Sequence, residues 1–255
     1  LRGSVPFDGI YSLIARLWQP DSILEIDEKN YLSFSPRLIR FGSSGLAGVW
    51  AEENTRESIY NAFRRKETFG TSGPRIKVRF FAGYNFENSN LNDQDLIQEA
   101  YSKNVPMGGD IIQEKGKNPR FLVWAISDPL GAPLQRVQII KGWLADGEQR
   151  EKVFDVACSD GQSVNPLSHR CPDNGAKVNL DDCSISREKG NAEIKTFWQD
   201  PEFSNDQEAF YYARVLENPT CRWSTWDAVR AEEKPRSDIP VTIQERAWSS
   251  PIWIK

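Results

Sequence analysis

Short segments that alternate apolar and polar residues fill the second half of the chain, from residue 105 onward. Side chains of a β-strand point to opposite faces in turn, so this period of two is typical of strands with one buried face. Turn-forming residues separate the segments, and no long stretch repeats with the helical period. The pattern therefore predicts an antiparallel β-sandwich. Its expected strands are residues 121–126, 134–143, 152–158, 192–198, 209–217 and 248–254.

One helix is predicted in the first third of the chain. Asn54 precedes Glu57 by three residues, which is the spacing of a capping box with Asn54 as the N-cap. An apolar face at the i, i+3, i+4 spacing follows within residues 59–63. The glycines and the proline of residues 68–74 cannot continue a helix, so we expect the helix to end near Glu67.

Strands are predicted on both sides of this helix. Residues 46–51 form a small apolar run, and residues 76–80 alternate apolar with charged side chains. The three elements together form one strand–helix–strand unit. A more polar region at residues 83–105 separates this unit from the strand-rich half. We therefore expect an α+β fold with two domains, residues 1–84 and 105–255.

Composition narrows the set of partners. The chain has 255 residues, of which 32 are Lys or Arg and 36 are Asp or Glu, so its formal net charge is −4. An acidic balance does not favour nucleic acid or an anionic membrane surface, and we expect neither as a partner. No run of about 18 apolar residues occurs, so no transmembrane span is expected.

Two residue types are nearly absent. His169 is the only histidine, so sites that need two or more imidazoles cannot be built from this chain alone, and we expect no metal ligand and no cofactor in it. No nucleophile elbow accompanies His169, which we interpret as a surface histidine. Met107 is the only methionine and the first residue is Leu1. We therefore expect a processed chain or a piece of a longer protein.

Four cysteines lie in the second half of the chain: Cys158, Cys171, Cys183 and Cys221. They form no CxxC pair, which argues against a zinc finger. An even number in turn-rich, polar sequence predicts two disulfides, and hence a periplasmic or extracellular bacterial protein. Four cysteines allow three pairings, and their spacing alone does not choose among them.

Two polar segments are candidates for chemistry. Glu52 and Glu53 stand between a predicted strand end and a helix start, where α/β folds bind ligands. Acidic residues at that place also simply favour the helix dipole, by about 0.3–1 kcal/mol each. Thr71, Ser72 and Arg75 belong to a small-residue loop that suits a phosphate or sulfate. The same loop is also an ordinary connection between elements, because the Gly-Lys-Ser/Thr end of a P-loop is missing.

Nine tryptophans occur in the chain. Trp223, Trp226, Trp248 and Trp253 lie near or after Cys221, and they are candidates for lining a sugar groove. Tryptophan in strands is more often a core residue whose indole N–H is satisfied. We expect core packing for most of the nine.

The chain resembles a known family at its longest motifs. Residues 45–57 (GLAGVWAEENTRE) and 64–76 (RRKETFGTSGPRI) look like the end of a PHP-type (polymerase and histidinol phosphatase) domain. More closely, they are similar to a domain-of-unknown-function family of exported bacterial proteins related to PHP phosphoesterases. This resemblance extends from about residue 36 to the end. Further matching stretches are residues 105–110, 128–134, 210–217 and 247–254.

The resemblance implies a metal-dependent, phosphoesterase-type hydrolase that uses divalent Zn, Mn or Fe. The Asp-x-His element that carries metal ligands in such proteins does not occur in this sequence. No metal ligand is therefore assigned. The chain then corresponds to the C-terminal part of such an enzyme: residues 1–84 would be the terminal strand–helix–strand unit of a PHP-like α/β barrel, and residues 105–255 a β-rich accessory domain.

On this hypothesis Glu52, Glu53, Arg56 and Arg75 border a catalytic site, with Thr71, Ser72 and Arg75 as ligand-binding residues. The partners are the missing N-terminal portion of the same protein and an unidentified small-molecule substrate. A second hypothesis from another class stays open: a non-catalytic β-sandwich that binds a carbohydrate or a protein.

Overall fold

The computed structural model describes residues 23–32, 40–42, 44–86, 90–205 and 207–255. The chain forms two compact units. The larger unit consists of residues 44–177, 185–220 and 244–255, and the smaller unit consists of residues 1–43, 178–184 and 221–243.

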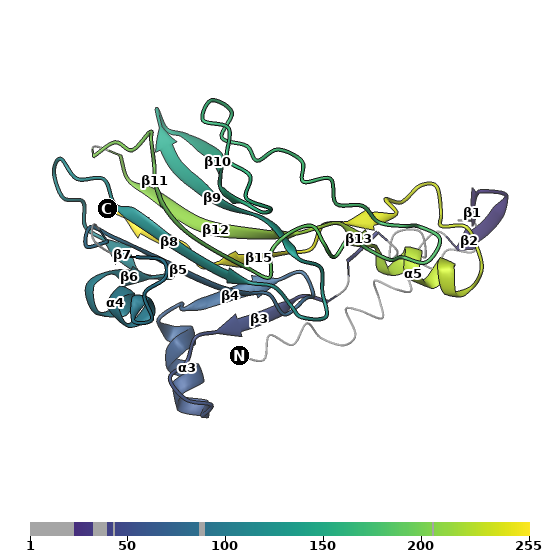
Figure 1. Cartoon of the computed structure of the whole chain (residues 1–255), viewed down its shortest axis with the longest axis horizontal. Helices are drawn as coiled ribbons and strands as arrows, with labels where there is room; N and C mark the ends of the chain where they lie inside the picture. The colour runs from purple at the N-terminus through teal and green to yellow at the C-terminus, as the bar shows by residue number, and fades with distance from the viewer. Residues whose placement is uncertain (1–22, 33–39, 43, 87–89, 206) are drawn as a thin grey trace. The chain divides into compact units, whose positions relative to one another are not determined.

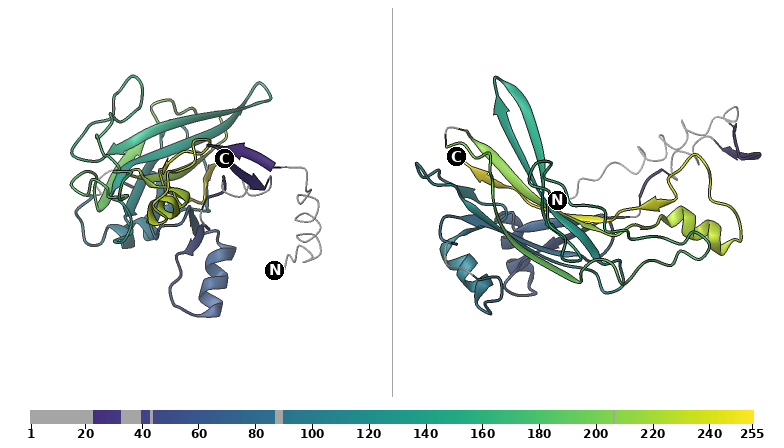
Figure 2. Two further views of the ribbon diagram at one scale, coloured as in Figure 1. Left: turned by 90° about the vertical axis from the view of Figure 1, so that its right-hand side faces the viewer. Right: turned by 45° about the horizontal axis from the view of Figure 1, so that its top comes forward.

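The larger unit is a β-sandwich (Figure 1). Its first sheet has the strand order β10-β9-β12-β15-β4-β3, with β16 beside β12 and β7 beside β16. Its second sheet has the order β11-β8-β5-β6. Neighbouring strands are antiparallel except for β16 and β7. The long hairpin of β9 and β10 is seen from two further sides in Figure 2.

The strands of the first sheet are β3 (Leu46–Val49), β4 (Thr68–Thr71), β7 (Asp110–Ile111), β9 (Leu134–Ala145), β10 (Glu148–Cys158), β12 (Ala209–Glu217), β15 (Arg246–Ser249) and β16 (Ile252–Ile254). Those of the second sheet are β5 (Lys77–Gly83), β6 (Val105–Pro106), β8 (Arg120–Ile126) and β11 (Glu193–Gln199). The sheets are antiparallel as predicted for residues 105–255, but the sandwich also includes β3, β4 and β5, whose residues were predicted to belong to a separate unit.

The core lies between the two sheets, and it follows from the period of two. On β12, Ala209, Tyr211, Ala213 and Val215 all face inward and are buried. The ring of Phe121 from the facing sheet lies 4.7 Å from that of Tyr211, measured between centroids. Burial of such large apolar faces is the main favourable contribution to folding, about 25 cal/mol per Å² of apolar surface.

The second sheet is buried on its other face as well. Phe81 and Leu122 point away from the sandwich core and contact Leu96 and Ala100 of helix α4 (Leu96–Lys103) in a second apolar cluster. A strand buried on both faces reads as a continuous apolar run, and this explains the sequence Phe80-Phe81-Ala82.

The predicted unit of a PHP-like α/β barrel is wrong. A barrel unit needs parallel strands joined by a helix, whereas helix α3 (Arg56–Arg64) connects the antiparallel neighbours β3 and β4. The predicted strand at residues 76–80 is β5, and it lies in the opposite sheet. The sequence around Gly70 suggests a turn, and for this reason strand β4 was not predicted. Gly70 in fact forms part of β4, where it pairs with Ala47 on one side and Trp248 on the other.

The start of helix α3 also differs from the prediction. Thr55, not Asn54, is the N-cap, and its hydroxyl accepts a hydrogen bond from the Ser58 backbone N–H at 3.2 Å. The Ser58 hydroxyl accepts in turn from the Glu53 backbone N–H at 3.1 Å. The helix therefore begins one residue later than predicted, and the third helical position bonds back to Glu53 rather than to the N-cap residue.

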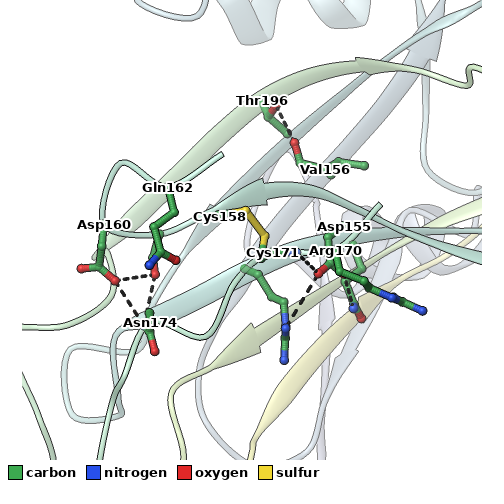
Figure 3. Close-up of a disulfide and its surroundings, with 12 residues drawn as sticks. Asp155, Val156, Cys158, Asp160, Gln162, Arg170, Cys171, Asn174 and Thr196 are labelled. Carbon is green, nitrogen blue, oxygen red and sulfur yellow. Dashed lines mark hydrogen bonds and ion pairs between the residues drawn. A yellow bond between two sulfur atoms is a disulfide. The ribbon is translucent and has the colours of Figure 1, made fainter. Parts of the chain in front are cut away.

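A disulfide joins Cys158 at the end of β10 to Cys171, with 5.6 Å between their Cα atoms (Figure 3). The neighbouring carboxylate of Asp155 accepts from the Cys171 backbone N–H at 2.7 Å and from the Gln138 side chain at 2.6 Å. The guanidinium of Arg170 lies 3.5 Å from the same carboxylate. The disulfide and this buried acid together attach the loop after β10 to the outer face of the first sheet.

The smaller unit contains the second disulfide, Cys183–Cys221. The guanidinium of Arg222 donates to the backbone carbonyls of Arg40 and Phe41 at 2.6 and 2.7 Å. This unit contains the hairpin of β1 (Ile23–Ile26) and β2 (Lys29–Leu32) and helix α5 (Trp223–Arg230). A short strand, β13 (Thr220–Cys221), begins where the chain passes from the larger unit into this one, and it pairs with β14 (Thr242–Ile243). The two predicted disulfides are confirmed.

We expect Thr55→Ala to weaken helix α3 by about 0.5–2 kcal/mol, because the substitution removes the N-cap hydrogen bond. Hydrogen exchange of the helix backbone amides measures this change locally. Asn54→Ala is the matched control and should leave the exchange rates unchanged. Faster exchange in the Asn54 variant than in the Thr55 variant would show that the helix begins one residue earlier.

Thiol titration checks the cysteine pairing. Unfolded, unreduced protein should show about zero free thiols, and peptide mapping should recover Cys158 with Cys171 and Cys183 with Cys221. Four free thiols, or any other pairing, would contradict the structure.

Candidate ligand-binding site

The two predicted site segments lie at opposite ends of the β3–β4 ladder. Val49 pairs with Thr68 at one end, and Leu46 pairs with Thr71 at the other. Glu52, Glu53 and Arg56 follow the first end and are exposed around the start of α3. The structure therefore does not bring these three residues together with Thr71, Ser72 and Arg75.

Hydrogen bonds within the chain occupy the second predicted segment. The Thr71 hydroxyl accepts from the Gly73 backbone N–H at 3.3 Å. The Ser72 hydroxyl accepts from the Arg246 backbone N–H at 2.8 Å. The Arg75 backbone N–H donates to the Asp128 carboxylate at 2.7 Å, while the Arg75 side chain is exposed. These contacts connect β4 and β5 to neighbouring loops, and in this arrangement the segment serves as a connection.

A buried acid lies near this connection. Glu217, at the end of β12, is only 1% exposed, and its Oε1 has no hydrogen-bond partner among the described residues. Burial raises the pKa of Glu217 to about 8, and the charges of Asp128 and Glu245 add to the rise, while a backbone N–H from Ala132 opposes it. The carboxyl group is therefore mainly protonated at neutral pH.

A buried polar network joins β9 and β12 inside the sandwich. The Lys141 ammonium donates to Asp200 Oδ2 at 2.7 Å, and the Tyr211 hydroxyl donates to the same oxygen at 2.7 Å. All three side chains are buried, and this network satisfies the charges inside the sandwich. His169 lies outside it, half-buried edge-on against Phe154.

The described residues do not fit the metal centre that the resemblance implies. Nowhere in this part of the chain do three His, Cys, Asp or Glu side chains come together in a way that could hold a metal ion. His169 has Glu202 beside it at 4.0 Å, a single carboxylate that is already paired with Lys152. A divalent metal in the full-length protein stays a prediction.

The larger unit also has an open groove of about 1100 Å³. Its walls come from the end of β9, the start of β10, the start of β12 and the end of β16. Its lining includes Leu144, Gln149, Glu151, Phe210 and Trp253. The groove is larger than the range of about 300–1,000 Å³ that is typical of small-ligand pockets. A pocket of about 170 Å³ in the smaller unit, beside α5, falls below that range.

Strand register brings two aromatic rings together in the groove. Phe210 of β12 pairs directly with Trp253 of β16, so both side chains lie on the outer face of the first sheet. Their ring centroids are 5.0 Å apart and their planes are inclined by 47°. On its other side Phe210 pairs with Gly142, and a Cβ at Gly142 would collide with the Phe210 ring. The glycine therefore lets the ring lie against the sheet.

Trp253 is 42% exposed and Leu144 is 66% exposed, so apolar surface remains open to a ligand. The ring of Tyr212, two residues along β12, stacks with Phe210 at a centroid distance of 6.4 Å. Sequence reasoning included Trp253 among the candidates for a sugar groove but missed Phe210. The signal was available in the alternation of residues 209–217, which places Phe210 and Tyr212 on the face opposite to the core.

The other tryptophan candidates lie elsewhere. Trp223 and Trp226 belong to helix α5 of the smaller unit and are 38% exposed each. Trp248 of β15 is half-buried opposite Arg214. Of the four tryptophans named from the sequence, Trp253 alone lines the groove.

The fold and the groove define a class: an antiparallel β-sandwich protein with an aromatic-lined groove at one edge. Residues 19–255 match the model of the family described as "Protein of unknown function (DUF3604)", and the chain belongs to that family. No curated protein and no solved structure matches the chain. The resemblance to a domain-of-unknown-function family is thereby confirmed, while its relation to PHP phosphoesterases stays a prediction.

Glu217 should make stability depend on pH. The folded state keeps this proton up to a pH of about 8, whereas the unfolded chain releases it near pH 4.5, so the free energy of unfolding falls as pH rises between these values. Glu217→Gln removes this contribution, which is at most about 1.4 kcal/mol per pH unit. The variant should therefore become more stable than the parent as pH rises.

Urea unfolding at several pH values across that window measures the difference. Glu57→Gln, at an exposed position of α3, is the control and should follow the parent. A Glu217 variant whose stability runs parallel to the parent at every pH would contradict the raised pKa.

Proposed function

We propose that this chain is a non-catalytic carbohydrate-binding module and that the groove is its binding site. The pair of adjacent rings, Phe210 and Trp253, in an open groove is the observation that carries this proposal. Aromatic faces pack against the C–H faces of sugar rings, as they do against other apolar surfaces. The volume of the groove, about 1100 Å³, suits an oligosaccharide rather than a single small molecule.

Polar groups beside the rings support a sugar ligand. Gln149 and Gln207 line the groove with amides, and Glu151 lines it with a carboxylate. The amides both donate to and accept from hydroxyl groups, which every sugar carries in several directions, and the carboxylate accepts from them. A protein partner would favour a wider surface with a dry apolar centre, of roughly 1,000 Å² or more in total. The mixed lining of the groove favours the carbohydrate.

The proposed location agrees with this function. No described helix combines the length and the hydropathy that a membrane span requires. Two disulfides are typical of proteins that fold in an oxidising compartment. We infer a periplasmic or extracellular location, where bacterial polysaccharides are accessible. The metal-dependent hydrolase function implied for a longer protein stays a prediction that no described residue supports.

Calorimetric titration with a panel of oligosaccharides tests the proposal. Trp253→Ala should lower the affinity for the bound sugar by about tenfold, because it removes one stacking face worth about 1.4 kcal/mol. Phe210→Ala should act in the same direction. Trp226→Ala, at a tryptophan of similar exposure in the smaller unit, is the matched control and should bind like the parent.

Failure of every oligosaccharide in the panel to bind would refute the proposal. Equal losses in the Trp253 and Trp226 variants would show that the sugar binds outside the groove. Retained folding of each variant is checked by its thermal unfolding profile.

A further inference from the structure

The charges around the groove are unevenly compensated. Arg150 donates to Glu148 at 2.6 Å, and Lys255 donates to Asp110 at 2.7 Å, so each basic residue of the groove has its own carboxylate. The groove is also lined by three acidic residues, Asp146, Glu151 and Glu208. None of the three forms an ion pair within the part of the chain that the structure describes. The groove therefore carries excess negative charge.

One of these acids lies in register with the aromatic pair. Glu151 of β10 pairs with Gly142 of β9, Gly142 pairs with Phe210, and Phe210 pairs with Trp253. Residues directly opposite one another on adjacent strands share a face of the sheet. A single row across four strands thus presents a carboxylate, a glycine and two aromatic rings to the same side.

The charge of Glu151 acts on the aromatic residues of this face. Burial raises the pKa of Tyr212, and the Glu151 carboxylate adds to that rise, against the opposing effect of Arg214. Tyr212 is the ring that stacks with Phe210. The negative charge is therefore near the surface on which a ligand would stack.

Aromatic faces and carboxylates attract the same kind of group. The face of an aromatic ring carries negative electrostatic potential and draws cations to it, and a carboxylate pairs with them directly. A uronic acid would instead meet like charge. Building on the proposed carbohydrate function, we propose that the groove selects amine-bearing, positively charged sugars, such as an oligosaccharide of glucosamine.

Three oligosaccharides of equal length separate the possibilities: a glucosamine oligomer, its N-acetylated counterpart and an oligogalacturonate. Titrations at about pH 6, where a sugar amine is protonated, use the full chain at low salt. The glucosamine oligomer should bind about tenfold more tightly than the N-acetylated one, and the oligogalacturonate most weakly. Added salt should reduce this preference, because it screens the charges.

Glu151→Gln should weaken binding of the glucosamine oligomer by about tenfold and leave the N-acetylated oligomer unaffected. Glu57→Gln removes the same charge from exposed helix α3, outside the groove, and should change neither affinity. Glu208→Gln provides a second removal of groove charge if the Glu151 variant does not fold.

The outcomes distinguish the two proposals. Equal binding of the charged and neutral oligomers, or tighter binding of the oligogalacturonate, would overturn the charge preference and leave the carbohydrate function intact. Equal losses in the Glu151 and Glu57 variants would overturn the role of the groove charge. If none of the three oligomers binds, and no other sugar does, the carbohydrate function itself falls.

Discussion

The alternation of side chains along β12 is the constraint on which both the core and the groove depend. Tyr211 must face inward, because its ring packs on Phe121 and its hydroxyl donates to the buried Asp200. A strand that buries Tyr211 necessarily turns Phe210 and Tyr212 to the opposite face. The same period of two that builds the sandwich therefore supplies the aromatic surface of the proposed site. A shift of register by one residue would exchange the two sets and destroy both.

Two glycines give aromatic rings a place against the first sheet. Phe210 lies over its cross-strand partner Gly142, and Phe69 lies over its partner Gly48. A side chain at either glycine would collide with the ring. Pairs of this kind compensate for the missing side chain of a glycine within a strand and hold the ring in one orientation. At Gly142 this arrangement places the Phe210 ring over the residue that pairs with Glu151, so that ring and carboxylate lie on the same face of the sheet.

Acidic side chains at the two ends of the sandwich differ in their burial and in their charge. Near the end of β12, Glu217 is enclosed beside Asp128 and Glu245, and burial keeps its proton on at neutral pH. At the groove, Glu151 is exposed and its charge is available to solvent and ligand. An enclosed, neutral carboxyl belongs to the structure, whereas an exposed carboxylate beside aromatic rings suits recognition of a cation. This contrast favours the groove as the functional surface of this member of the DUF3604 family.

Local patterns in the sequence determined the β-rich class, several strands and the presence of two disulfides. Residues 209–217 were predicted to be a strand and coincide with β12, because alternation is a property of neighbouring residues. Only the tertiary structure decided that Gly70 lies within a strand, that Thr55 caps α3, and that β5 belongs to the second sheet. The groove was decided in the same way, because Glu151, Phe210 and Trp253 are brought into one row by hydrogen bonds between strands that are distant in sequence. Pairing across such distances leaves no trace in any single segment, since each strand specifies which face is buried but not which strand will lie beside it.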